Sequence, residues 1–138
     1  MRVYLDSSAL IKRSIAEAES DAVEATIGEH VAAGDVVVTS SLAWIEVSRA
    51  LRSRPADGVD DGLVQDSIDA ALSGVAEHLI TAEVVGLARR VGPRPLRTLD
   101  AIHMATAVLL DADLVVAYDD RLLDAFRHNG LAVATPGR

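Results

Sequence analysis

Short apolar runs alternate along this chain with longer segments of helical periodicity. RVYLD (residues 2–6), DVVVTS (35–40) and DLVVAYD (113–119) are continuous apolar runs, a pattern typical of strands buried on both faces of a sheet. EHLI (77–80) and LAVAT (131–135) predict two shorter strands. Because helical segments separate the strands, the pattern predicts an α/β fold with a central parallel sheet of about four to five strands and helices on both faces.

The segments between these runs carry helix signals. Apolar spacing, caps and breakers predict helices over residues 8–15, 19–33, 41–54, 63–72, 81–91, 98–110 and 121–130. Ser7 or Ser8 is the expected N-cap of the first helix, and Gly34 ends the second. Residues 55–62 are polar and rich in turn formers, so we expect a loop there. The sequence contains no linker or repeat, which predicts a single domain over residues 1–138.

Composition restricts the make-up of the core, the kinds of metal site and the expected location of the protein. Half of the 138 residues are hydrophobic but only 3% are aromatic, so the core must consist largely of Ala, Val, Leu and Ile. The chain has no cysteine, which excludes disulfides and thiolate zinc sites. Asp6 interrupts the N-terminus before a signal peptide could form, and no apolar run reaches the roughly 18 residues of a membrane span. We therefore expect a soluble, cytoplasmic protein with no membrane partner.

The net charge of −8 argues against a broad basic surface for nucleic acid. However, carboxylates that hold metal ions would make this formal count misleading. Twelve of the 13 cations are Arg, and several are grouped in the sequence, namely Arg49, Arg52 and Arg54, then Arg89, Arg90, Arg94 and Arg97. Such groups suit either phosphate binding or an ordinary solvated surface.

Two acids end predicted strands. Asp6 ends the first apolar run, and Asp119 ends the run over residues 113–119. Ligands of open parallel sheets bind beyond the carboxyl ends of the strands, so both acids are candidate site residues. Each could instead cap the helix that follows. Asp120 is the better cap candidate of its pair, which would free Asp119 for another role.

Two further acids lie in predicted helices with apolar surroundings. Glu46 lies at the edge of an apolar helix face, where pairing with Arg49 or contact with water is the alternative to a functional role. Asp100 lies near the start of a helix that is apolar almost all round and should be buried. The helix dipole would stabilise an exposed acid there by about 0.3–1 kcal/mol, but it does not explain an acid that enters the core. His103, one turn further on, could be a ligand, but we expect a hydrogen-bonded packing residue.

If the four acids converge, their cluster is unstable unless protons or cations offset its charge. At about 5 Å and an effective dielectric constant near 20, each like-charged pair costs roughly 3 kcal/mol. A divalent metal would relieve this repulsion, and all-oxygen ligands without Cys favour Mg²⁺ or Mn²⁺. A metal with open coordination positions could then promote phosphodiester hydrolysis. The gaps of 40, 54 and 19 residues between the acids do not by themselves enforce convergence.

Four segments together resemble the PIN-domain ribonucleases of the VapC toxin type. They are VYLDSSALIKR, TSSLAWIEVSRAL, RTLDAIHMATA and LVVAYDDRLLDAFRHNGLAV, in the family's order from residue 3 to nearly the end of the chain. LDAIHMATA is the most specific piece. The resemblance implies a PIN-like fold, Mg²⁺- or Mn²⁺-dependent endoribonuclease activity on RNA, a homodimer and a cognate antitoxin.

The resemblance also implies roles for individual residues. It predicts an acidic site made of Asp6, Glu46, Asp100 and Asp119. Ser7 and Ser8 match the small hydroxyl residues that help to hold the site or its water in this family. The doubled acid departs from the family pattern, because Asp120 could share or take over the role of Asp119.

Our mechanistic hypothesis combines both lines of argument. One or two metal ions would be held, directly or through water, by Asp6, Asp100 and Asp119. Glu46 would orient or deprotonate the attacking water, so that RNA is cut by in-line hydrolysis. The candidate phosphate-binding cations are Arg49, Arg52, Arg97 and Arg121. Each of these could instead be solvated surface.

Two other kinds of protein stay open on the sequence. One is another Mg²⁺-dependent phosphohydrolase, although a haloacid-dehalogenase-type phosphatase would need a second Asp where Ser8 stands. A phosphoacceptor receiver domain would need a Lys after the last strand, whereas Lys12 is the only lysine. The other is a catalytically inactive α/β binding module whose acids only cap helices. A metal titration separates this module from a carboxylate metal site.

Overall fold

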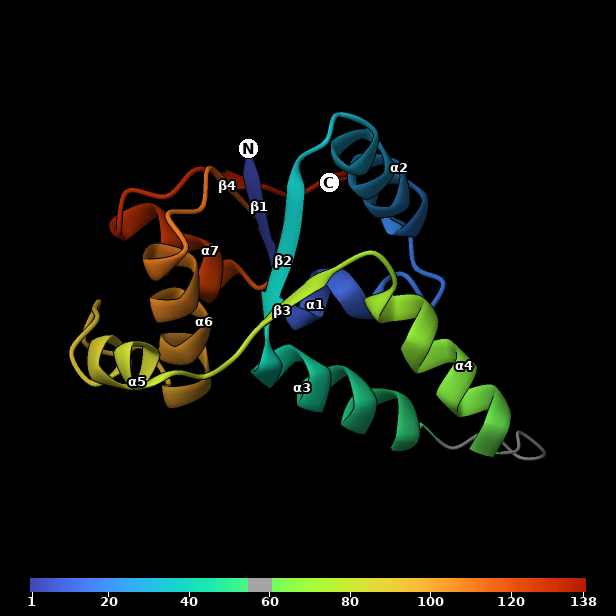
Figure 1. The fold of residues 1–138 in the computed structure, drawn as a ribbon, viewed down its shortest axis with the longest axis horizontal. Coiled ribbons are helices and arrows are strands. Elements are labelled where there is room, and N and C mark those ends of the chain that lie inside the picture. The colour runs from blue at the N-terminus through green and yellow to red at the C-terminus, as the bar shows by residue number, and fades with distance from the viewer. Residues whose placement is uncertain (55–60) are drawn as a thin grey trace.

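The computed structural model describes residues 1–54 and 61–138. Its centre is a five-stranded sheet with the strand order β3-β2-β1-β4-β5, in which every neighbouring pair is parallel (Figure 1). The strands are β1 (Arg2–Leu5), β2 (Val36–Ser40), β3 (Ala76–His78), β4 (Leu114–Val116) and β5 (Val133–Ala134). The parallel sheet predicted from the apolar runs is therefore confirmed.

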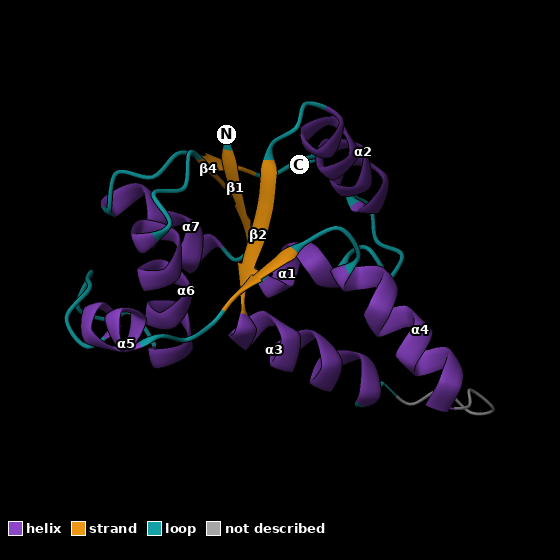
Figure 2. Cartoon of the chain, in the orientation of Figure 1, coloured by secondary structure: helices purple, strands orange, loops and turns teal. Residues whose placement is uncertain are grey.

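Helices cover both faces of this sheet, as predicted (Figure 2). They are α1 (Ser7–Ile11), α2 (Ser20–Ala32), α3 (Ser41–Arg52), α4 (Asp61–Leu72), α5 (Ala82–Ala88), α6 (Thr98–Leu109) and α7 (Asp120–His128). Val3 and Leu5 of β1 belong to the core that includes residues of α1 to α4. Tyr4 points to the other face and packs with residues of α6 and α7, while α5 packs against α6. None of the helices within the described ranges is long and apolar enough to cross a membrane.

Three local predictions are corrected by the structure. The N-cap of α1 is Asp6, whereas Ser7 and Ser8, the expected caps, lie inside the helix. Asp61, expected in a loop, begins α4, and residues 55–60 of the predicted loop lie outside the described residues. The helix predicted to reach residue 91 ends at residue 88. These differences shift boundaries by a few residues and leave the order of elements unchanged.

Strand register aligns the carboxyl ends of the three central strands. Leu5 of β1 pairs with Val116 of β4, and Tyr4 pairs with Val38 of β2. The segments that follow β1, β2 and β4 therefore leave the sheet at the same edge. A site at this edge can draw side chains from parts of the chain that are far apart in sequence.

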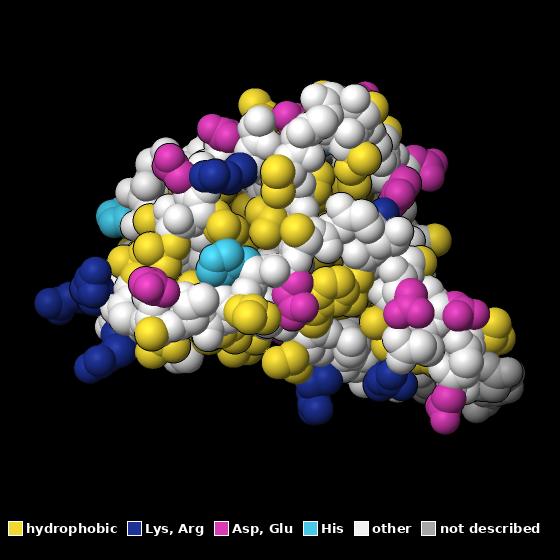
Figure 3. Space-filling model, in the orientation of Figure 1, with side chains coloured by type: hydrophobic (Ala, Val, Ile, Leu, Met, Phe, Trp, Pro, Cys, Tyr) yellow, Lys and Arg dark blue, Asp and Glu magenta, His cyan; other side chains and the backbone are white. Residues whose placement is uncertain are grey.

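Charge is distributed unevenly over the surface. In the face shown in Figure 3, acidic side chains gather over α4, which carries the exposed acids Asp61, Asp66 and Asp69. Lys and Arg side chains project at the opposite end of the molecule, beyond α5, where the exposed cations include Arg89, Arg90 and Arg94. The net negative charge thus coexists with a locally basic end.

Candidate active site

Asp6 is a buried carboxylate at the junction of β1 and α1, with an exposure of 3%. Its Oδ1 accepts hydrogen bonds from the backbone N–H of Ala9 at 3.1 Å and from the hydroxyl of Ser8 at 2.6 Å. Burial raises the pKa of Asp6; His103 and these hydrogen bonds oppose the rise, and the charge of Glu46 adds to it. Asp6 therefore caps a helix and is also a carboxylate whose charge the fold disfavours.

Asp119 lies three residues after the end of the neighbouring strand β4 and directly before the next helix. It caps α7, with Oδ1 accepting a hydrogen bond from the backbone N–H of Leu122 at 3.1 Å. The prediction that Asp120 caps this helix and frees Asp119 is wrong, because Asp119 holds the extended backbone conformation at the helix start. Asp120 lies one residue inside the helix, where its Oδ1 accepts from Nη1 of Arg138 at 2.8 Å.

Ser8 joins these two strand–helix junctions. The backbone N–H of Tyr118 donates to Oγ of Ser8 at 2.9 Å, and the Ser8 hydroxyl in turn donates to Asp6. The residue directly before Asp119 is therefore tied to Asp6 through one hydroxyl. Ser7, the other predicted hydroxyl residue, is half-buried at the first position of α1.

Glu46 is held by a histidine. Oε1 of Glu46, on α3, lies 2.6 Å from Nε2 of His103, on α6. The other ring nitrogen, Nδ1, lies 2.6 Å from the hydroxyl of Tyr4, on β1. Because His103 is 2% exposed, this chain of three side chains links the buried centre of the sheet to a partly exposed carboxylate. Glu46 thus has His103 as its partner rather than Arg49.

The interpretation of His103 as a hydrogen-bonded packing residue is correct but incomplete. Its partners, Tyr4 and Glu46, come from segments 99 and 57 positions away, so local sequence could not identify them. The sequence offered one indication that His103 lies near the site: it follows Asp100 by one helical turn, on the same side of the helix. That spacing indicates proximity to the site but not the bridge to Glu46.

Asp100 lies in the first turn of α6, as predicted, and is partly buried. Burial raises the pKa of Asp100, and the negative charge of Asp119 raises it further. His103 opposes this rise, whereas Glu46 adds to it. Since Asp6 also interacts with Glu46 and His103, the four predicted acids form one electrostatically coupled cluster at the carboxyl end of the sheet.

The cluster fits a divalent cation by its chemistry. Carboxylate oxygens are the ligands that Mg²⁺ and Mn²⁺ prefer, and a cation would offset both the burial and the mutual repulsion of these acids. As the side chains stand, no three Asp, Glu or His residues in the described parts of the chain lie close enough to hold one ion. The acids are therefore coupled through charge without meeting at a single point.

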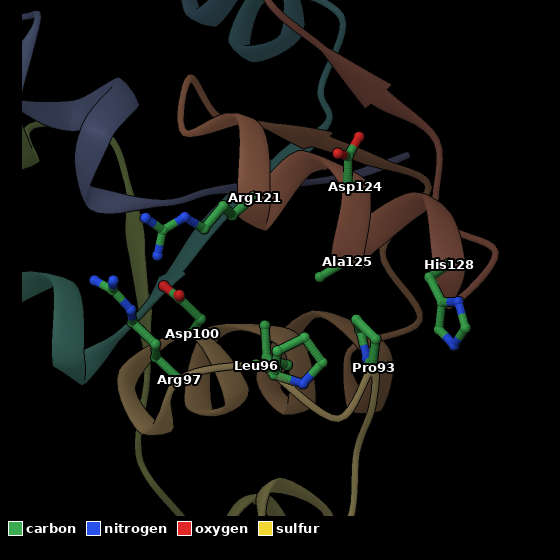
Figure 4. Close-up of a pocket in the computed structure, with 9 residues that line it drawn as sticks. Pro93, Leu96, Arg97, Asp100, Arg121, Asp124, Ala125 and His128 are labelled. Atoms are coloured by element: carbon green, nitrogen blue, oxygen red, sulfur yellow. The ribbon is translucent and has the colours of Figure 1, made fainter.

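The four predicted phosphate-binding arginines fall into two pairs. Arg97 and Arg121 line a cavity of about 520 Å³ together with Asp100 (Figure 4). Arg49 and Arg52 lie on α3 and do not line this cavity; Arg52 donates to Oε1 of Gln65 at 2.7 Å. The structure thus brings the first pair, and not the second, to the same cavity as one of the acids.

Family membership follows from comparison with known sequences. Residues 3–128 match the family model of the PIN domain, and the chain belongs to this family. It is 39% identical over 140 residues to Ribonuclease VapC46 of Mycobacterium tuberculosis (strain ATCC 25618 / H37Rv), covering 97% of each chain. It is 34% identical over 137 residues to Ribonuclease VapC47 of the same species (strain CDC 1551 / Oshkosh), covering 98% of this chain and 97% of that protein. The resemblance to VapC-type PIN domains is confirmed.

Solved structures share the fold at lower identity. VapBC2 from Rickettsia felis, bound to a DNA fragment from its promoter, contains a chain that matches with a TM-score of 0.73 and 14% identity, covering 97% of this chain and 98% of that one. The Mycobacterium tuberculosis toxin VapC20, described as cleaving the sarcin-ricin loop, matches with a TM-score of 0.65 and 18% identity, covering 89% and 94%. These matches establish a shared architecture.

Proposed function

We propose that this protein is a metal-dependent endoribonuclease that hydrolyses RNA phosphodiester bonds. It acts as the toxin of a toxin–antitoxin pair and arrests growth by inhibiting translation. The observation that carries this proposal is the coupled acid cluster at the carboxyl end of the sheet, made of Asp6, Glu46, Asp100 and Asp119. Two relatives that match over nearly their full length are named ribonucleases, which supports the choice of RNA as substrate.

Three of the acids are the proposed ligands of one or two Mg²⁺ or Mn²⁺ ions, namely Asp6, Asp100 and Asp119. A bound cation would polarise the phosphate, lower the pKa of the attacking water and stabilise the leaving oxygen. Burial of Asp6 and the effect of Asp119 on Asp100 support this assignment, because both make an uncompensated negative charge unfavourable. Ser8 and the backbone N–H of Ala9 fix one oxygen of Asp6, which restricts the carboxylate to one orientation.

Glu46 is the proposed residue that orients or deprotonates the attacking water. His103 holds one of its oxygens from the buried side, while the Glu46 side chain stays 27% exposed and so remains in reach of water. Arg97 and Arg121 are the proposed phosphate-binding cations, since they share a cavity with Asp100. RNA bound by these cations would place a phosphate next to the acids.

The proposal includes a partner and an assembly. One solved structure with the same fold is that of VapBC2 from Rickettsia felis bound to a DNA fragment from their promoter. We therefore propose a cognate antitoxin for this chain, a homodimeric toxin and a cytoplasmic location. Antitoxin binding should suppress RNA cleavage when the two proteins are expressed together.

The decisive experiment is sequencing of RNA ends after induced expression of the chain. The wild type should generate new RNA ends, and Asp6→Asn should reduce them by about 100-fold or more, because it removes a proposed metal ligand. Asp66→Asn, which removes an exposed acid on α4, is the matched control and should cleave like the wild type. Full cleavage by the Asp6→Asn variant would contradict the proposed site.

A metal titration separates this function from that of an inactive binding module. Mn²⁺ at about 100 times its dissociation constant should stabilise the wild type by about 2.7 kcal/mol, and Asp6→Asn should lose most of this gain. Urea unfolding with and without Mn²⁺ measures the difference. Equal stabilisation of both variants would place the ion elsewhere, and no stabilisation of either would favour the binding module.

A further inference from the structure

The cavity beside Asp100 lies between α7 and the segment that leads into α6. Its lining includes apolar groups from both sides, with Pro93 and Leu96 facing Ala125 (Figure 4). At about 520 Å³ it falls within the range of small-molecule sites, roughly 300–1,000 Å³. Its size and partly apolar wall therefore suit a small organic group.

The cavity is polar at one end. Figure 4 shows Arg97 and Arg121 on the same side as the carboxylate of Asp100. Within the described parts of the chain neither guanidinium forms a hydrogen bond or an ion pair, so both are available for a ligand. Burial raises the pKa of Asp100, and the charge of Arg97, which lines the same cavity, opposes this rise. An anionic group of a ligand would therefore bind at this end.

The other end of the cavity carries an aromatic ring. His128, the last residue of α7, belongs to the lining and lies at the end away from Asp100 (Figure 4). Asp124 also belongs to the lining, but it pairs with Arg127 at 3.1 Å and its carboxylate points away from the cavity. The order along the cavity is thus cationic, apolar and aromatic.

We propose that this cavity binds one unpaired nucleobase of the RNA, with the adjoining phosphate held by Arg97 and Arg121. This inference rests on the proposed function and names the part of the substrate that the site recognises. A nucleotide has the same order of groups, an anionic phosphate followed by a flat base whose faces stack on rings and apolar side chains. Bases inside a duplex are stacked and paired, so the cavity would select single-stranded segments or loops.

The first test does not require cleavage. The four nucleoside 5′-monophosphates and ribose 5-phosphate are titrated in EDTA into the labelled protein, and NMR follows the signals of Ala125, His128 and the two arginines. The nucleotides should shift all of these signals, whereas ribose 5-phosphate, which lacks a base, should shift only those of Arg97 and Arg121. The inference is overturned if no nucleotide shifts Ala125 and His128, or if ribose 5-phosphate shifts them as strongly.

The second test uses an RNA oligonucleotide that the wild type cleaves. His128→Ala should raise KM by about tenfold through lost stacking, with kcat little changed, and His128→Phe should restore most of the loss. His30→Ala, which removes a histidine outside the cavity lining, is the control and should leave KM unchanged. An unchanged KM for His128→Ala would contradict the inference.

A series of versions of the same oligonucleotide, each with one abasic position, locates the recognised base. One abasic position next to the cleaved bond should weaken cleavage by the wild type, but it should add little to the defect of His128→Ala, because both changes remove the same contact. Fully additive effects at every position would contradict a shared contact. If nucleotides bind in the cavity but no RNA is cleaved, the proposed function alone fails. If RNA is cleaved but nucleotides do not reach the cavity, the nucleobase subsite alone fails.

Discussion

At both the β1–α1 and the β4–α7 junction, an aspartate follows a central strand and caps the next helix through its Oδ1 atom. Asp6 accepts from Ala9 and Asp119 accepts from Leu122, each at 3.1 Å. Asp6 is buried, and burial raises its pKa, whereas Asp119 is exposed. Two sites with the same local structure thus carry carboxylates in different surroundings.

The comparison indicates that capping a helix and binding a ligand are not mutually exclusive roles for an aspartate. A cap occupies one carboxylate oxygen, so an aspartate can stabilise a helix start and still present its charge to a ligand. What separates the two residues is their surroundings: burial raises the pKa of Asp6, His103 opposes this rise, and Glu46 adds to it. Asp119 in turn acts on Asp100, so each junction contributes one capped acid to the same cluster.

Removing His103, which bridges Glu46 and Tyr4, should have the largest effect on stability. His103→Ala removes the partner of one Glu46 oxygen and one of the partners of the buried Tyr4 hydroxyl, and it opens a cavity. The free energy of unfolding should fall by about 3 kcal/mol, measured by urea denaturation. His128→Ala, at an exposed position, should change it by less than about 0.5 kcal/mol. Equal losses in the two variants would show that the His103 bridge contributes little.

The next substitution, Asp6→Asn, tests whether the β1–α1 junction makes the stability of the protein depend on pH. Because the pKa of Asp6 is raised in the folded state, that state binds a proton that the unfolded chain has already released. The metal-free stability contributed by Asp6 therefore falls as pH rises from about 4 through the raised pKa. Asp6→Asn should remove this fall, so its advantage over the wild type should grow with pH.

Urea unfolding in EDTA across this pH range measures that advantage. Asn keeps the capping oxygen, so loss of the cap should not obscure the result. Asp66→Asn controls for the loss of one negative charge. A difference between Asp6→Asn and the wild type that shrinks as pH rises would have the wrong sign for a disfavoured carboxylate.

A smaller effect is expected from the cap on the other junction. Asp119→Ala removes the acceptor for the Leu122 N–H and should destabilise the protein by about 1 kcal/mol. Asp119→Asn keeps an acceptor and should cost only a few tenths of that. Thermal unfolding in EDTA measures both. If the two variants are equally destabilised, the charge of Asp119 rather than its cap supports α7.

The smallest effect is expected from the acid beside this cap. Asp120 pairs with Arg138 at 2.8 Å, but both side chains are exposed, so Asp120→Ala should cost less than about 0.5 kcal/mol. The loss should shrink further at high salt, which screens exposed charges. Urea unfolding at low and high salt tests this. A larger loss than that of Asp119→Ala would reverse the assignment of the cap.

The sequence was sufficient for the order of elements, because the apolar runs at 2–6, 35–40 and 113–119 are too short for typical helices and have the pattern of strands buried on both faces. It was not sufficient for the caps. Choosing between Asp119 and Asp120 depends on where α7 begins, and the local sequence does not separate them because aspartate is a good cap at either position. The partners of His103 and the cavity between α7 and residues 93–97 could not be predicted either, because both depend on contacts between segments that are distant in the sequence.

The position of β1 in the centre of the sheet has a consequence for how the chain is made. β1 leaves the ribosome before the other strands of the sheet, yet one of its two neighbours is β4, and the backbone N–H of Tyr118 donates to Ser8 across 110 positions. Contacts of such long range form late, after the intervening chain is available. In a nascent chain that has not yet reached β4 and α7, the strand that ends at Asp6 lacks one of its two neighbours, and Asp119 is not yet present. The acid cluster is therefore complete only after the segment that contains β4 and Asp119 has been synthesised.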